Sequence, residues 1–143
     1  MSVAETSYPQ AVEDTDNAGY LEGWRRGRLM LQKCCACKKL NFYPRPMCPS
    51  CWSDSLEWIE ASGFGKIISY SLVHRPNHPS FADDVPLTLA EIMLEEGVGM
   101  LARVLSDSPY SGMRVELAND PESVRKYPLP IFRPVSLATS IQQ

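Results

Sequence analysis

The sequence predicts a mainly β protein in which a short N-terminal helix and a small metal-binding module precede a five-stranded antiparallel barrel. Two Cys-x₂-Cys pairs between residues 34 and 51 indicate the metal module. After residue 57, short runs rich in Val, Ile, Leu and Tyr are separated by turn signals, and no long helical pattern follows, which is typical of a small barrel. Apolar residues make up 44% of the 143 residues, which is enough for a core.

Composition divides the chain into four segments. The first contains acidic residues but no Lys or Arg, and it has no apolar periodicity, so we expect it to be loose. The predicted segments are an acidic flexible tail (1–16), the helix with the metal module (17–56), the barrel domain (57–135) and a C-terminal tail (136–143).

The helix is expected to follow Asp16 or Asn17, either of which can cap it, and Gly27 is a suitable stop. A helix this short needs docking to persist. Its predicted docking face consists of Tyr20, Leu21 and Trp24.

The two cysteine pairs are predicted to form one tetrahedral site of four sulfur ligands, which suits zinc or iron. With all four positions filled by protein, a zinc ion would have no open position for water, so we expect a structural role. The predicted ligands are Cys34, Cys37, Cys48 and Cys51. Cys35 is a fifth cysteine, and a register that uses Cys35 with Cys37 stays open. The alternative of two disulfides is disfavoured because the chain begins with no secretion signal.

The barrel strands are predicted from apolar runs. Residues 87–94 and 98–105 flank a Glu-Gly pair and are expected to form a hairpin. The remaining predicted strands are 66–74, 113–117 and 129–132.

Charge is distributed unevenly along the chain. Residues 23–53 contain seven Lys and Arg residues and no acid, so the rest of the chain carries a net charge of −10. Four thiolates and one Zn²⁺ would offset only about two of these positive charges. A basic segment of this kind is expected to bind an anion.

These residues resemble a known family. The runs LQKCCACKKLNFYPRPMCPSCWSDSLEW, ASGFGKIISYSLVH, LEEGVGMLARV and LPIFRPV are similar to those of DUF35 proteins, which are acyl-CoA-associated OB-fold proteins with an N-terminal rubredoxin-like zinc ribbon. The resemblance covers about residues 18–135. It implies a non-catalytic accessory subunit of a thiolase-type acyltransferase complex that binds or channels CoA thioesters and stabilises its partner. Partnership with an acyl-CoA hydratase or a synthase is the alternative.

Three positions depart from that family's pattern. Lys38 and Trp52 stand where glycine usually follows the second and fourth cysteines, and Tyr43 stands where proline is common. We expect the metal ligands to be unaffected, and an exposed Trp52 could face a partner.

If CoA is a ligand, its phosphates, which carry about four negative charges, are expected to meet the basic segment. The candidates are Arg25, Arg26, Arg28, Lys39 and Arg45. Taken singly, each of these side chains is more often a solvated surface charge than a ligand contact. No catalytic residue is predicted, because the sequence shows no triad or acid–base pair, and a strand-end histidine such as His74 and a loop histidine such as His78 are more often structural or solvent-facing.

Two other function classes are possible. A nucleic-acid-binding zinc-ribbon and OB-fold module is disfavoured because the barrel half is acidic. A rubredoxin-like electron carrier is disfavoured by the attached barrel and the missing glycines. The chain has no apolar run long enough to span a membrane and no leader, so we expect a cytoplasmic protein.

Overall fold

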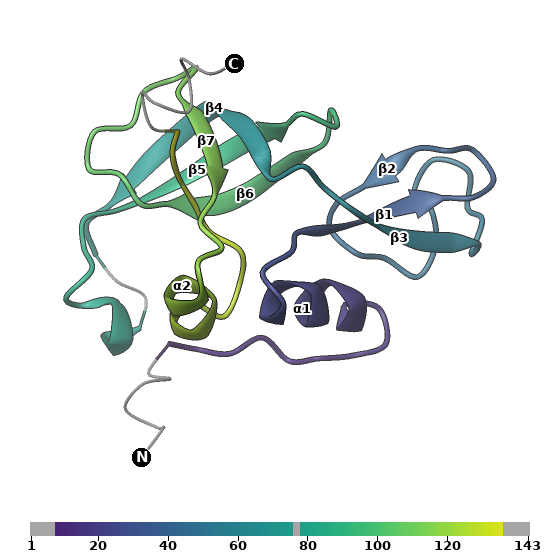
Figure 1. The fold of residues 1–143 in the computed structure, drawn as a ribbon, viewed down its shortest axis with the longest axis horizontal. Coiled ribbons are helices and arrows are strands. Elements are labelled where there is room, and N and C mark those ends of the chain that lie inside the picture. The colour runs from purple at the N-terminus through teal and green to yellow at the C-terminus, as the bar shows by residue number, and fades with distance from the viewer. Residues whose placement is uncertain (1–7, 76–77, 136–143) are drawn as a thin grey trace.

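The computed structural model describes residues 8–75 and 78–135. A small three-stranded sheet lies on one side of the molecule and a closed barrel on the other, with helix α1 (Ala18–Arg25) beneath them (Figure 1). In the described part of the chain, no helix is long and apolar enough to cross a membrane.

Helix α1 ends where the sequence predicts. Gly27 has a φ of +76°, its N–H donates to the Trp24 carbonyl at 2.8 Å, and the Arg28 N–H donates to the Gly23 carbonyl at 2.9 Å. This is the glycine-dependent Schellman arrangement. The predicted side-chain cap is wrong: Asn17 occupies the N-cap position, but its side chain accepts from the N–H of Asp14 and makes no capping bond to the helix.

The predicted docking face is confirmed, because Tyr20, Leu21 and Trp24 are all buried. The indole N–H of Trp24 donates to the Tyr127 carbonyl at 2.8 Å and so ties the helix to the segment that precedes the last barrel strand. On the other side, a Cβ at Gly19 would collide with the ring of Trp58, so the close approach of helix and ribbon requires glycine there.

The metal module is a three-stranded antiparallel sheet in the order β2-β1-β3, formed by β1 (Met30–Cys34), β2 (Leu40–Asn41) and β3 (Leu56–Glu60). All five residues of β3 pair with β1. The predicted boundary between residues 56 and 57 therefore falls inside a strand that belongs to the ribbon by its pairing.

The barrel closes in the order β4-β5-β6-β8-β7, and β7 pairs back to β4. The predicted hairpin is confirmed as β5 and β6, with Gly97 at a φ of +83° in the turn. The strands are β4 (Phe64–Val73), β5 (Leu87–Leu94), β6 (Gly99–Val104), β7 (Arg114–Leu117) and β8 (Phe132–Pro134).

The purely antiparallel barrel is a wrong prediction. β8 pairs antiparallel with β7 but parallel with β6, where Val104 lies opposite Phe132. Between β7 and β8 the chain passes through helix α2 (Pro121–Lys126), which was not predicted. β8 then lies between β7 and β6 and runs in the same direction as β6. The last strand also begins later than expected, because Pro128 and Pro130 have no N–H for a ladder.

Part of the predicted N-terminal tail packs on the barrel side of the molecule. Tyr8 is only 7% exposed, and its ring stacks on Phe81 at 5.1 Å and on Tyr127 at 5.6 Å between centroids. Phe81 belongs to a short 3-10 helix, η1 (Pro79–Phe81). Residues 1–7 and the predicted C-terminal tail (136–143) lie outside the described residues.

Candidate metal centre

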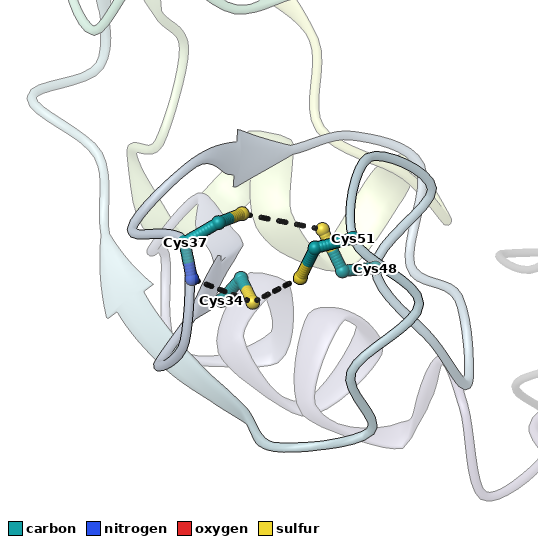
Figure 2. A group of neighbouring side chains, drawn as sticks. All are labelled: Cys34, Cys37, Cys48 and Cys51. Atoms are coloured by element: carbon teal, nitrogen blue, oxygen red, sulfur yellow. Dashed lines mark hydrogen bonds between the residues drawn. The ribbon is translucent and has the colours of Figure 1, made fainter.

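Four cysteine sulfurs converge in the ribbon, two from each side (Figure 2). The Sγ atoms lie within 4.8 Å of one another, with Cys34 and Cys51 at 3.5 Å and Cys37 and Cys48 at 3.6 Å. A tetrahedral zinc ion with bonds of about 2.3 Å would place its sulfurs about 3.8 Å apart. The donor set and its spacing therefore fit a closed tetrahedral zinc site.

The two halves of the site have the same backbone bonding. The N–H of Lys38 donates to the Cys34 carbonyl and the N–H of Trp52 to the Cys48 carbonyl, each at 2.9 Å. Both cysteines also receive an N–H at sulfur, from Cys37 and Ser50 respectively, at 3.4 Å. These two knuckles, one after β1 and one in the loop before β3, hold opposing sulfur pairs.

The knuckle N–H groups favour thiolates. A backbone hydrogen bond from Cys51 lowers the pKa of Cys48 to about 6, and one from Cys37 lowers the pKa of Cys34. The N–H of Ser53 lowers the pKa of Cys51, but the hydrogen bond with Cys34 and burial outweigh it and raise that pKa to about 11. A dication among the sulfurs would remove this conflict, since a coordinated thiol loses its proton.

Cys35 does not join the sulfur cluster, which settles the register in favour of Cys34 with Cys37. The Cys35 N–H donates to the Ser55 carbonyl at 2.8 Å. All five cysteines are free, and the closest sulfur pairs lie well beyond the roughly 2.05 Å of a disulfide. The disulfide alternative is therefore absent from the structure.

Two polar residues that the sequence did not single out support the site. Gln32 is only 6% exposed, and its amide brackets Arg45: the Arg45 N–H donates to Oε1 at 2.8 Å and Nε2 donates to the Arg45 carbonyl at 3.1 Å. Asn41 donates from Nδ2 to the Cys48 sulfur at 3.9 Å. The sequence contained one signal that could have identified Gln32, because it is a polar residue that directly follows the apolar start of β1.

The two residues that replace the family's usual glycines adopt a backbone conformation that favours glycine. Lys38 and Trp52 have φ values of +69° and +67°, the left-handed conformation that glycine adopts without a steric penalty. Trp52 is also 74% exposed, so its indole gains little from burial within this chain.

Trp52→Gly is expected to raise the free energy of unfolding by about 0.5–1 kcal/mol, because relief of the left-handed penalty exceeds the extra backbone entropy of glycine. Trp52→Ala keeps the same penalty and should bring no gain. Urea unfolding of the zinc-loaded variants measures the difference, and equal stability of the two variants would show that the backbone here is unstrained.

The five residues predicted to meet CoA phosphates differ in their carboxylate partners. Arg25 pairs with Glu13 at 2.7 Å and with Glu22 at 3.1 Å, and Arg26 also pairs with Glu22, at 3.2 Å. These pairs are exposed, so they are weak and could exchange for another anion.

The other three candidates are less constrained. The Arg28 Nε lies 4.0 Å from Glu60 Oε1. Lys39 and Arg45 are exposed and form no ion pair with any described carboxylate. Lys39 follows the first knuckle, and the backbone of Arg45 is fixed by Gln32.

The two histidines are not part of the cysteine cluster. His74 is exposed, and His78 uses its ring Nδ1 to accept from the Ser80 N–H at 3.1 Å at the start of η1. Among residues 8–75 and 78–135, the four cysteines form the one group of His, Cys, Asp and Glu close enough together to hold a metal ion.

Two family models match the chain in order. The zinc ribbon model, described as "ChsH2, rubredoxin-like zinc ribbon domain", matches residues 21–57. The second, described as "ChsH2, C-terminal OB-fold domain", matches residues 58–120. Together they account for the converging cysteines and the closed barrel.

Curated relatives give the same family. A probable enoyl-CoA hydratase alpha subunit from Thermomonospora curvata is 36% identical over 88% of this chain, which spans 40% of that relative. DUF35 domain-containing scaffold proteins from Pyrococcus furiosus and Methanothermobacter thermautotrophicus are 40% and 33% identical, over 59% and 77% of their own lengths. The chain thus spans less than two thirds of the first two of these relatives.

Solved structures agree on the fold. One chain of an assembly described as "Ltp2-ChsH2(DUF35) aldolase" matches with a TM-score of 0.72 and 36% identity, covering 87% of this chain and 98% of that chain. A DUF35 protein of unknown function from Sulfolobus solfataricus has a TM-score of 0.62 at 14% identity, which supports the fold alone. With these matches and the ribbon and barrel described above, the chain belongs to the DUF35 family of proteins that join a rubredoxin-like zinc ribbon to an OB-fold.

Proposed function

We propose that this chain is a non-catalytic accessory subunit that stabilises a catalytic partner acting on CoA thioesters, with one structural zinc ion in its ribbon. The observation that carries the proposal is the match to a DUF35 chain of an aldolase assembly over 98% of that chain.

We infer that the partner makes or breaks a carbon–carbon bond next to a thioester carbonyl, as a thiolase-type enzyme or an aldolase does. The structural relative's description names an aldolase, and its DUF35 chain is matched almost completely. A hydratase partner is the second candidate, supported by the name of the Thermomonospora relative, of which this chain spans 40%. Either assembly would work in the cytoplasm, where cysteine thiols stay reduced.

CoA phosphates would meet the ribbon rather than the barrel. Lys39 and Arg45 are the best placed of the candidates, because neither pairs with a described carboxylate. Arg25, Arg26 and Arg28 would have to exchange glutamate partners for phosphate.

Affinity purification of this chain from its own host is expected to recover a thiolase-like or aldolase-like subunit at a fixed ratio. The reconstituted pair is then assayed for thiolysis, for aldol cleavage of a β-hydroxyacyl-CoA and for hydration of an enoyl-CoA. We expect one of the first two activities, with the partner alone poorly soluble or inactive. A partner that is fully active alone and never co-purifies would refute the accessory role.

The same complex tests the CoA contacts. A chain carrying Lys39→Gln and Arg45→Gln should assemble normally but raise the KM for the CoA thioester, while Arg125→Gln with Lys126→Gln on α2, which also removes two exposed positive charges, serves as a matched control. An unchanged KM would place the CoA contacts on the partner.

A further inference from the structure

A largely apolar hollow of about 340 Å³ lies on the barrel side of the molecule, away from the cysteines. Its floor includes Leu87, Leu89 and Leu101. In the register of β5 and β6, Leu89 lies opposite Arg103 and Leu101 opposite Glu91, and these alternate with the buried inward-facing residues, so the floor is the outer face of the barrel. Small-molecule sites start at about 300 Å³ and are mostly apolar with a few polar groups.

Aromatic side chains from distant parts of the chain form the walls. Tyr8 from the N-terminal segment is stacked between Phe81 of η1 and Tyr127, which follows α2, and all three line the hollow. Leu101 and Leu129 also line it and are 69% and 41% exposed, so apolar surface extends to its mouth.

Arg103 gives the hollow one polar end, and a partly buried ion pair with Asp84 holds its guanidinium. Arg103 Nη1 lies 3.2 Å from Asp84 Oδ2, and the two side chains are only 17% and 18% exposed. The Tyr8 hydroxyl donates to the same carboxylate oxygen, and the Arg103 guanidinium lies 5.4 Å from the Tyr127 ring centroid. Burial and the hydrogen bond to Asp84 raise the pKa of Tyr8 to about 12, so this hydroxyl remains a donor at neutral pH.

The charges in this group restrict what could bind. Asp84 neutralises Arg103, so an additional anion would lie close to a carboxylate as well as to the guanidinium. Arg103 still has N–H groups beyond the one that donates to Asp84, since a guanidinium carries five. A neutral carbonyl oxygen can accept one of them without introducing an unpaired charge.

We propose that this hollow, walled by Tyr8, Phe81 and Tyr127 and with Arg103 at its polar end, binds a neutral apolar molecule or group that carries a carbonyl oxygen. The apolar body lies on the outer face of β5 and β6, and the carbonyl accepts from Arg103. This site goes beyond the accessory role, because it gives the chain a ligand of its own and does not require the partner.

The probe is Prodan, a neutral naphthalene dye with one ketone, added to the zinc-loaded full chain without partner. We expect saturable binding at one site with a blue-shifted emission. The analogue 6-propyl-2-dimethylaminonaphthalene carries a methylene in place of the ketone carbonyl and should bind about tenfold more weakly, the loss expected for one hydrogen bond to a charged donor. Equal affinity of the two dyes, or failure of Prodan to saturate, would overturn the proposal.

Two kinds of variant locate the site. Leu89→Trp fills the floor and Leu101→Asp places a charge at the mouth, and each should weaken Prodan binding about tenfold or more. Leu101 is exposed, so its variant remains informative if Leu89→Trp folds poorly. Tyr110→Asp is the matched control, since Tyr110 is 58% exposed and does not line the hollow. Equal binding by the Leu101 and Tyr110 variants would place the dye elsewhere.

The polar end is tested with the double variant Asp84→Leu and Arg103→Met, which removes both charges and leaves neither unpaired. It should bind the two dyes equally. Competition then identifies the source of the ligand: displacement of Prodan by octanoyl-CoA points to a thioester acyl group, and displacement by 2-nonanone alone points to a free ketone. Displacement by CoA without an acyl group would contradict the proposal.

Discussion

Cys48→Ser is expected to abolish stoichiometric zinc binding and to unfold the ribbon, whereas Cys35→Ser should leave both intact. Cys48 is 1% exposed and is one of the four converging cysteines, so its replacement removes a buried ligand from the tetrahedral site. Structural zinc in small peptides contributes about 10–16 kcal/mol, as much as the whole net stability of many domains. The ribbon's sheet has only twelve residues in three strands and depends on the ion.

Elemental analysis of the purified variants measures the zinc, and amide NMR spectra report folding of the ribbon and the barrel separately. Cys35→Ser is the matched control, because Cys35 is adjacent in sequence and outside the sulfur cluster. Loss of zinc in both variants, or a native ribbon in Cys48→Ser, would contradict a structural site made of these four ligands.

Phe132→Ala is expected to lower the free energy of unfolding by about 3–5 kcal/mol, as truncation of buried phenylalanines does. Phe132 is fully buried in β8, where it lies opposite Val104 of β6 and Leu117 of β7. The truncation therefore leaves a cavity at the strand that closes the barrel.

Urea unfolding of the zinc-loaded protein measures this loss as a shift of the midpoint at an unchanged slope. Tyr110→Ala removes a ring of similar size from a position that is 58% exposed, and it should change the stability by no more than about 0.5 kcal/mol. Similar losses in the two variants would mean that Phe132 is not a core residue.

Local patterns in the sequence were sufficient for the metal site and much of the fold. Each cysteine pair forms its knuckle within a few residues, so the spacing identified the site, and the structure settled whether Cys34 or Cys35 joins Cys37. Gly27 ends α1 and Gly97 turns the β5–β6 hairpin, because both need a positive φ that few other residues tolerate. Apolar runs likewise predicted both strands of that hairpin.

Other elements could not be predicted from local patterns. Helix α2 has a recognisable start, in which Asp120 accepts from the Ser123 N–H and Pro121 follows, but six residues give too little periodicity to indicate a helix. The position of β8 beside β6 depends on how the rest of the barrel is closed, and no pattern in its three residues specifies a parallel neighbour.

The sequence alone determined the metal site, the basic segment and the hairpin strands of the barrel, because each depends on neighbours within a few residues. Only the tertiary structure decided the choice of Cys34 over Cys35, the parallel closure by β8, the pairing of Arg25 with Glu13 and the aromatic hollow. The hydrogen bond from Tyr8 to Asp84 joins residues 76 positions apart, and that from Trp24 to Tyr127 joins residues 103 positions apart. Contacts at such separations arise from the packing of the whole chain, and composition and spacing carry no record of them.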